Sequence, residues 1–237
     1  MATALKNLIL SFNSRSGLPS HRHGFTLAEV LITLGIIGVI AAITIQNLIT
    51  NYQKTQTVVQ LQKTYTSLAQ AGKQSESDNG SSQSWDLGTT GDGTSLSQSF
   101  STYWAPYLKI TKYCSSASNC GYNTAMFYRL DGTYTGYFGP DDGTLAVLSD
   151  GTIFFWRHSN LTENIFFVDI NGVKTPNTYG KDVFIFSMDS TKGLVPYSYT
   201  NDTSATINAN CSKSGQGQEC AAKIIRDGWI IADDYPW

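Results

Sequence analysis

The chain has 237 residues, a formal net charge of -2 and only 14% charged residues. This length accommodates one anchoring helix and one globular domain, but not several large hydrophobic cores. The charge balance gives no indication of nucleic-acid binding. Gly, Ser, Thr, Asn and aromatic residues are abundant, which is typical of a turn-rich β domain outside the cytoplasm.

The first 24 residues form a basic leader. They contain Lys6, Arg15 and Arg22, no Asp or Glu, and end in HRHG. Positive charge on this flank of an apolar segment favours a cytoplasmic N-terminus. Removal of the leader would take away three basic residues, so the remaining chain would have a net charge of -2 - 3 = -5.

An apolar run of 21 residues follows, from Phe25 to Ile45, with Glu29 as its single charge. As a helix it spans about 30 Å, enough to cross the hydrocarbon core of a bilayer. It is too long for the apolar region of a secretory signal. A carboxylate inside the membrane costs about 2.5 to 3.5 kcal/mol and usually has a partner and a function. The simplest interpretation is a single-pass anchor in which Glu29 lies near enough to the cytoplasmic end to snorkel.

The sequence GFTLAEVLITLGIIGVIAAITI closely resembles the N-terminal signature of type IV pilins and type II secretion pseudopilins. The resemblance implies cleavage between Gly24 and Phe25 and methylation of the new amine of Phe25. It also implies an assembly role for Glu29, whose carboxylate would pair with the Phe25 ammonium of a neighbouring subunit. Neither charge would then be left alone in an apolar filament core.

Further expectations follow from the same resemblance. The partners would be a prepilin peptidase, other copies of the chain and related pilins, an inner-membrane assembly platform and membrane lipid. The chain would be held in the bacterial cytoplasmic membrane with its C-terminal domain outside the cytoplasm, and would later enter a periplasmic or cell-surface filament. One departure is Gln46, where many family members have a Pro, so a local unwinding of the helix is less assured, although Gly35 and Gly38 still weaken it.

The helix is predicted to leave the membrane and to continue to about Ala71, so that residues 25–71 form a transmembrane and assembly helix. Its apolar stripe recurs at helical spacing at Val58, Leu61, Tyr65 and Leu68. This stripe predicts packing on a domain. The alternative, a helix lying on a membrane surface, would need a denser basic face.

A polar loop is predicted over residues 72–95, which are rich in Ser, Gly, Gln, Asn and Asp. The globular domain would then occupy residues 96–237. Its first element is a predicted short helix, bent at Pro106, with the apolar residues Leu96, Phe100, Tyr103, Trp104, Tyr107 and Leu108. These aromatics fit a core, and a sugar-binding shelf is the alternative.

Short aromatic and β-branched runs dominate residues 125–188 and predict strands. They are AMFYRL, TYTGYF, TLAVL, TIFFWR, NIFFVDI and VFIFSM, separated by Asp131-Gly132, Asp142-Gly143, Asp150-Gly151 and Asn171-Gly172. Asp-Gly and Asn-Gly tolerate the positive φ of tight hairpin turns, so we expect an antiparallel meander. The fold class is therefore α+β, and a long N-terminal helix on an antiparallel sheet is also what the pilin resemblance implies.

Four cysteines occur as two close pairs, Cys114 with Cys120 and Cys211 with Cys220. Local disulfides are favoured in an oxidising compartment. Zinc is the competing interpretation. Neither pair has the spacing of common zinc sites, and His158 is the only His after the leader.

The stretch from Val168 to Phe186 concentrates side chains with oxygen donors around a turn. As a group these side chains could be ligands of a calcium ion: Asp169, Asn171, Asn177 and Asp182. Some type II secretion pseudopilins bind calcium in a C-terminal loop. The spacing does not match an EF-hand, and Asp and Asn are also ordinary turn residues. The chain ends in DGWIIADDYPW, which resembles a C-terminal pattern of pseudopilin-like proteins and predicts a last strand at Trp229 to Ile231.

No common catalytic motif is present, neither a Gly-x-Ser-x-Gly elbow, nor a zinc-protease helix, nor a phosphate-binding loop. We therefore expect a structural, non-enzymatic subunit of a type II secretion pseudopilus or a type IV pilus-like filament. The alternative function is that of a membrane-tethered binding protein, an adhesin or lectin, that uses the aromatic-rich domain.

Overall fold

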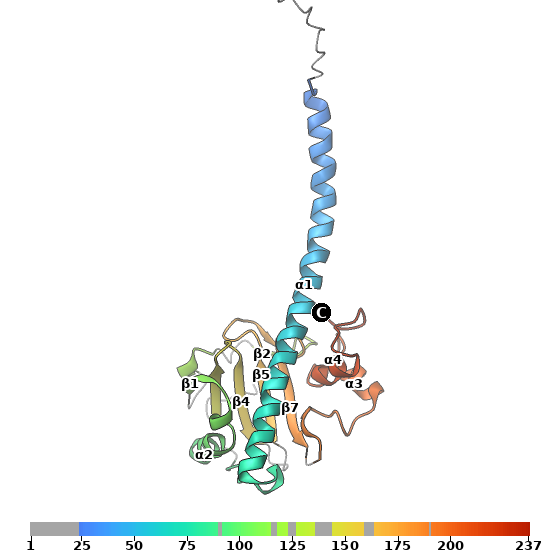
Figure 1. Ribbon diagram of the computed structural model, residues 1–237. Helices are drawn as coiled ribbons and strands as arrows, with labels where there is room; N and C mark the ends of the chain where they lie inside the picture. The colour runs from blue at the N-terminus through green and yellow to red at the C-terminus, as the bar shows by residue number, and fades with distance from the viewer. Residues whose placement is uncertain are drawn as a thin grey trace, which may run out of the picture. The chain divides into compact units, whose positions relative to one another are not determined.

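A computed structural model describes residues 24–89, 92–114, 118–122, 127–135, 144–158, 164–189 and 191–237. The leader up to residue 23 and the predicted Asp142-Gly143 turn lie outside this description. The chain divides into two compact units, residues 1–48 and 49–237, and each is described here by itself. Figure 1 labels the helices and strands.

The longest element is helix α1, Leu27–Asn79, which begins in the first unit and ends in the second. Within the second unit its buried side chains include Val58, Leu61 and Leu68, as the apolar stripe predicts. The helix does not stop at Ala71, and the predicted polar loop is therefore shorter than expected. Gly72 lies within the helix, and a Cβ at this position would be 3.4 Å from Trp104 and Met188, so a small residue suits this close packing.

The rest of the predicted loop contains the short helix η1 (Ser82–Ser84) and the start of α2 (Gly93–Tyr103). A second short helix, η2 (Ala105–Tyr107), follows α2. The Asp92 side chain caps α2 by accepting from the Thr94 amide at 3.0 Å. Helix α2 ends just before Pro106, as predicted. Its Phe100 and the following Trp104 are fully buried, so these aromatics belong to the core and not to an exposed sugar-binding shelf.

The main sheet has six strands in the order β1-β3-β4-β5-β7-β8, and every neighbouring pair is antiparallel. The strands are β1 (Ile110–Cys114), β3 (Thr144–Leu148), β4 (Ile153–His158), β5 (Asn164–Asp169), β7 (Val183–Asp189) and β8 (Gly193–Pro196). The predicted α+β architecture, a long helix with an antiparallel meander, is confirmed. Figure 1 shows the second half of α1 lying across the sheet.

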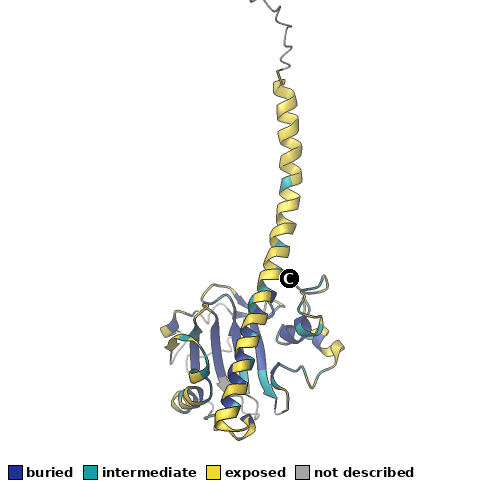
Figure 2. Cartoon of the chain, in the orientation of Figure 1, coloured by how far each residue is buried: buried dark blue, intermediate teal, exposed yellow. Residues whose placement is uncertain are grey.

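Both faces of the sheet are buried, which explains why its strands read as nearly continuous apolar runs. In β4, Phe154 and Trp156 pack under α1 and α2, whereas Ile153 and Phe155 belong to a second cluster on the other face. Figure 2 shows the buried strands of this unit in dark blue. Successive side chains point to opposite faces of a strand, so two apolar layers leave no polar alternation.

Other elements depart from the sequence prediction. The described part of the run AMFYRL, residues 127–130, contains the short strand β2 (Phe127–Tyr128), which pairs in parallel with β6 (Asn177–Thr178). The described part of TYTGYF forms a single bridge at Tyr134. The C-terminal region contains helices α3 (Ser204–Asn210) and α4 (Cys220–Arg226).

The predicted last strand at Trp229 to Ile231 is wrong, because no strand is assigned there. Helix α4 ends in a capping turn in which Gly228 has a φ of +78° and Trp229 a φ of +64°. The Trp229 amide donates to the Ile224 carbonyl at 2.8 Å, a bond that closes the end of the helix.

Candidate functional site

The first turn of α1 is built around a reciprocal pair of residues, Thr26 and Glu29. The Thr26 amide and its Oγ1 hydroxyl both donate to Glu29 Oε2 at 2.8 Å, and the Glu29 amide donates to Thr26 Oγ1 at 3.2 Å. This is a capping box, in which the side chains at the N-cap and N3 positions satisfy each other's free amides. The spacing Thr-x-x-Glu was the signal for it in the sequence, and Thr26 is a residue that the sequence analysis did not single out.

The predicted processing residues lie immediately before this turn. Gly24 and Phe25 precede the helix, and the Phe25 side chain is 88% exposed. A peptidase could therefore approach the bond between them without unfolding α1. The structure contains a single copy of the chain, so the pairing of Glu29 with a neighbour's amine stays a prediction.

The apolar run is exposed around its whole circumference within the first unit. Figure 2 shows this part of α1 as largely exposed, and Ala41 is intermediate. Among the described residues, α1 is the one helix that is long and apolar enough to cross a membrane, and its most apolar window has none of its residues buried. An apolar patch of this size needs lipid or other apolar helices around it.

The four predicted calcium ligands come together in a buried turn at the ends of β5 and β7. Asp169 Oδ1 accepts from the Asn171 and Gly172 amides at 3.0 and 3.1 Å, and its Oδ2 accepts from the Tyr122 hydroxyl at 2.8 Å. Asp169 and Asn177 are fully buried. Sequence analysis missed Tyr122, because it lies 47 residues before Asp169.

The second acid of this turn is also held by the protein's own donors. The Thr178 amide donates to Asp182 Oδ1 at 2.5 Å, and Asn171 Nδ2 donates to Asp182 Oδ2 at 3.0 Å. With its amide group turned, Asn177 donates to Asp169 Oδ2 at 3.2 Å and to the Lys174 carbonyl at 2.7 Å. Both carboxylates of the turn are thus held by hydrogen bonds from the protein's own donors.

The pKa values of the two acids in this turn are both raised above the usual value of an aspartate. Burial, followed by the charge of Asp182, raises the pKa of Asp169 to about 8 despite its three hydrogen-bond donors. Burial also raises the pKa of Asp182 to about 6 against the bonds from Thr178 and Asn171. A proton on one acid relieves the repulsion between the pair near neutral pH.

These residues fit calcium poorly. Calcium takes six to eight oxygen ligands, and each carboxylate oxygen of Asp169 and Asp182 already accepts a hydrogen bond from the protein. No cluster of three or more acidic, His or Cys side chains suited to a metal ion occurs within the described residues. The arrangement is suited to holding the β5–β7 connection, residues 170–182, in a fixed shape.

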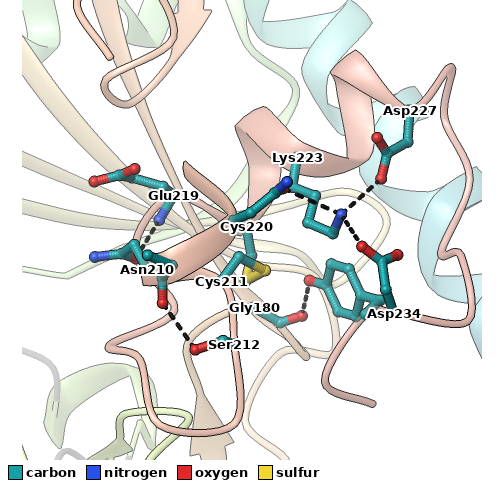
Figure 3. The surroundings of a disulfide bond; sticks show 12 residues. Gly180, Asn210, Cys211, Ser212, Glu219, Cys220, Lys223, Asp227 and Asp234 are labelled. Atoms are coloured by element: carbon teal, nitrogen blue, oxygen red, sulfur yellow. Dashed lines mark hydrogen bonds and ion pairs between the residues drawn. A yellow bond between two sulfur atoms is a disulfide. The ribbon is translucent and has the colours of Figure 1, made fainter. Parts of the chain in front are cut away.

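Both cysteine pairs form disulfides. Cys114 and Cys120 are joined with a Cα–Cα distance of 5.8 Å, and Cys211 and Cys220 with one of 5.0 Å. The second disulfide connects α3 to α4 beside Gly180 (Figure 3). It thus fixes α3 to α4, and Cys220 packs closely against Gly180 of the neighbouring turn.

Helix α4 also carries a buried lysine. Lys223 is 3% exposed, and its Nζ lies 2.7 Å from Asp234 Oδ2 and 3.2 Å from Asp227 Oδ2. Figure 3 shows these two ion pairs next to the disulfide. Burial alone would lower the pKa of Lys223, but the hydrogen bonds to Asp234 and Asp227 raise it above its usual value. A lysine held in the charged form serves as an anchor and not as a nucleophile.

Two family models match the chain, and the boundary between the two matches lies at the end of the apolar run. A model of the prokaryotic N-terminal methylation motif matches residues 19–45. This motif is the prepilin-type signal of type IV pilins and pseudopilins. A model of a family of unknown function (DUF6613) matches residues 47–237. No curated protein and no solved structure matches the chain.

Proposed function

We propose that this chain, which belongs to the DUF6613 family, is a structural subunit that assembles into a type II secretion pseudopilus or a type IV pilus-like filament. The methylation motif supports a type IV pilin-like subunit, and the exposed apolar helix fits a membrane anchor. In this proposal the chain is processed after Gly24, and Phe25 becomes its methylated first residue.

The observation that carries the proposal is the position of Glu29 in the matched motif. Glu29 is the one charge in the apolar run Phe25–Ile45, and the most apolar window of this helix has none of its residues buried. In a filament of parallel helices, the ammonium of a processed Phe25 would neutralise this carboxylate on a neighbouring subunit. The capping box with Thr26 satisfies Glu29 by hydrogen bonds but leaves its charge uncompensated.

Each segment of the chain would have its own role in the filament. We propose that residues 1–24 are a removable leader, and that residues 25–71 supply the transmembrane and assembly helix. The folded domain at residues 96–237 would then coat the outside of the filament. The C-terminal resemblance favours a type II secretion pseudopilus over a type IV pilus. A prepilin peptidase, an inner-membrane assembly platform and related pilins would be its partners.

Mass spectrometry of the N-terminus, on protein purified from its own host, tests the processing. The expected mature chain begins with N-methylated Phe25 and lacks the basic leader. A mature chain that retains its first 24 residues would contradict the proposal.

Two variants of Glu29 separate its charge from its capping role. Glu29→Gln keeps the capping box, since Gln at N3 also accepts these hydrogen bonds, but it removes the charge. Glu29→Ala removes both. We expect both variants to insert into the membrane and neither to enter filaments. Normal filaments from Glu29→Gln would show that capping, and not charge pairing, is the role of this residue. A tethered adhesin would tolerate both changes.

A further inference from the structure

Three Asn side chains of the described structure lie in the sequence pattern Asn-x-Ser/Thr. They are Asn79, followed by Gly-Ser, Asn201, followed by Asp-Thr, and Asn210, followed by Cys-Ser. A fourth, Asn160, lies outside the described residues. This pattern is the acceptor sequence for N-linked glycans, but alone it is a weak signal in a chain rich in Ser and Thr. A glycan acceptor must also present its amide nitrogen at the surface, and the structure separates the three on this point.

Two of these side chains are held by the protein itself. Asn79 Nδ2, at the end of α1, donates to the Tyr107 hydroxyl at 3.1 Å. Asn210, at the end of α3, is half-buried, and its Oδ1 accepts from the Glu219 amide at 3.1 Å. The next residue, Cys211, is 1% exposed and forms a disulfide. A transferase would have to break these interactions to reach either amide nitrogen.

Asn201 differs from both. It is exposed in the connection between β8 and α3, residues 197–203. Its Oδ1 accepts from Thr200 Oγ1 at 3.3 Å, whereas its Nδ2 donates no hydrogen bond within the described residues. The amide nitrogen of Asn201 is therefore available to a transferase without any loss of native contacts.

The backbone around Asn201 is fixed by Arg226 of α4. Arg226 Nη2 donates to the carbonyls of Tyr199 and Asp202 at 2.8 and 2.9 Å, and its guanidinium carbon lies 5.1 Å from the centre of the Tyr199 ring. These contacts use carbonyl oxygens and a neighbouring ring, and none of them uses the Asn201 side chain. A bulky group on that side chain would therefore leave the connection between β8 and α3 in place.

We propose that Asn201 is an N-glycosylation site, modified by a saccharide that is carried on a pyrophosphate lipid. Asn201 Nδ2 forms a bond to the anomeric carbon of the saccharide, and the bond between this carbon and the pyrophosphate oxygen breaks. The pyrophosphate leaves as an anion, and a base of the transferase takes one proton from Nδ2. This inference rests on the proposed placement of the folded domain outside the cytoplasm, where a lipid carrier in the same membrane brings the saccharide to the anchored chain.

Mass spectrometry of the full chain, purified from its own host, reduced and digested after Lys and Arg, tests the site. One peptide, residues 193–213, contains Asn201 and Asn210 together with Asn208, which lies outside the acceptor pattern. The variant Asn201→Gln removes the proposed acceptor. Asn208→Gln is the matched control, because it changes another exposed Asn in the same peptide.

Two changes at Thr203 separate the acceptor pattern from the fold. The Thr203 side chain caps α3 by accepting from the Thr206 amide at 3.2 Å. Thr203→Asp keeps a good N-cap but destroys the acceptor pattern, whereas Thr203→Ser keeps both. Matching circular dichroism spectra would show that the variants share one fold.

We expect the peptide to carry an added saccharide mass in the unchanged chain, in Asn208→Gln and in Thr203→Ser, and to lose it completely in Asn201→Gln and in Thr203→Asp. An unmodified peptide from the unchanged chain would overturn the proposal. A saccharide mass that persists in Asn201→Gln would also overturn it, because the glycan would then be on another side chain. The N-terminal peptide of the same sample reports the processing separately. A chain that begins at Phe25 without the glycan refutes only this site, and a glycosylated chain with its leader intact refutes only the processing.

Discussion

Lys223 in α4 and Asp234 in the C-terminal segment form an ion pair of 2.7 Å although the lysine side chain is only 4% exposed. The pair connects the last residues of the chain to α4, and Tyr235 next to it donates to the Gly180 carbonyl. A buried ammonium that loses its carboxylates is costly, whereas an exposed carboxylate that loses its ammonium is rehydrated.

The two partners should therefore contribute unequally to stability. We expect Asp234→Asn to lower the free energy of unfolding by about 1 to 3 kcal/mol, because the buried Lys223 ammonium loses the closer of its two carboxylate partners among the described residues. Lys223→Met should cost less, since Met fills the buried space and the Asp234 carboxylate, whose side chain is 65% exposed, is rehydrated. Chemical denaturation of the full chain in mild detergent measures both. A larger loss from Lys223→Met than from Asp234→Asn would contradict this order.

Gly180 is a position where a single methyl group should disturb the packing around the C-terminal disulfide. Its φ is +78°, and a Cβ there would lie 2.6 Å from Cys220 Sγ, in the disulfide with Cys211. We expect Gly180→Ala to cost about 2 to 5 kcal/mol, from the left-handed backbone and from overpacking together.

Gly132→Ala is the matched control, because Gly132 has a φ of +82° and nothing within 4 Å of the position that a methyl group would take. Its cost should be the backbone strain alone, about 1 to 2 kcal/mol. Thermal unfolding of the two variants, recorded side by side, separates overpacking from strain. Equal melting temperatures would show that the disulfide yields to the extra methyl group.

The strands were predictable where local chemistry decides the structure. Asp150-Gly151 connects β3 to β4 as a tight turn, and the aromatic runs on either side form the paired strands. Where tertiary packing decides, the prediction failed. Gly72 resembles a helix end in the sequence, yet α1 continues through it to Asn79, and Trp104 lies close to that small residue. Trp229 resembles a strand residue, but the cap of α4 determines its backbone.

In the candidate sites too, features set by neighbouring residues were predictable from the sequence, and features set by tertiary contacts were not. The capping box could be predicted from the sequence, because Thr26 and Glu29 are only three positions apart. Both residues lie within the matched methylation motif. The acidic turn was predictable as a cluster because its members share one stretch of chain. Its hydrogen-bond saturation was not, because Tyr122 comes from a distant segment and because backbone amides supply the other donors.

The same saturation predicts how the protein responds to calcium. Binding would require Asp169 and Asp182 to give up at least part of five hydrogen bonds within the described residues. We therefore expect millimolar calcium, or its removal by a chelator, to shift the melting temperature of the full chain by less than about 1 °C, since a ligand stabilises only when its concentration exceeds its Kd. A calcium-dependent rise of several degrees that Asp169→Asn abolishes would restore the calcium hypothesis for this turn.

A pH-dependent stability is expected from Glu219, which precedes the disulfide residue Cys220 and is 7% exposed. Burial, followed by the charge of Asp202 and a hydrogen bond to it, raises the pKa of Glu219 to about 7, with Arg226 acting in the opposite direction. In the unfolded chain a glutamate titrates near about 4.3. The folded state therefore holds the extra proton between these two values.

The sign of the effect follows from proton linkage. The stability that Glu219 contributes is fully present below about pH 4.3 and is lost as the pH rises through about 7. Glu219→Gln keeps the neutral form at every pH, so its free energy of unfolding should fall less steeply than that of the unchanged chain between pH 5 and pH 8. Asp233→Asn, a change at an exposed acid, is the control and should leave the slope unchanged. Denaturation curves at four pH values across this range decide the question. If Glu219→Gln and the unchanged chain lost stability in parallel, Glu219 would carry no extra proton in the folded state, and the pH dependence would have to arise from the Asp169–Asp182 pair.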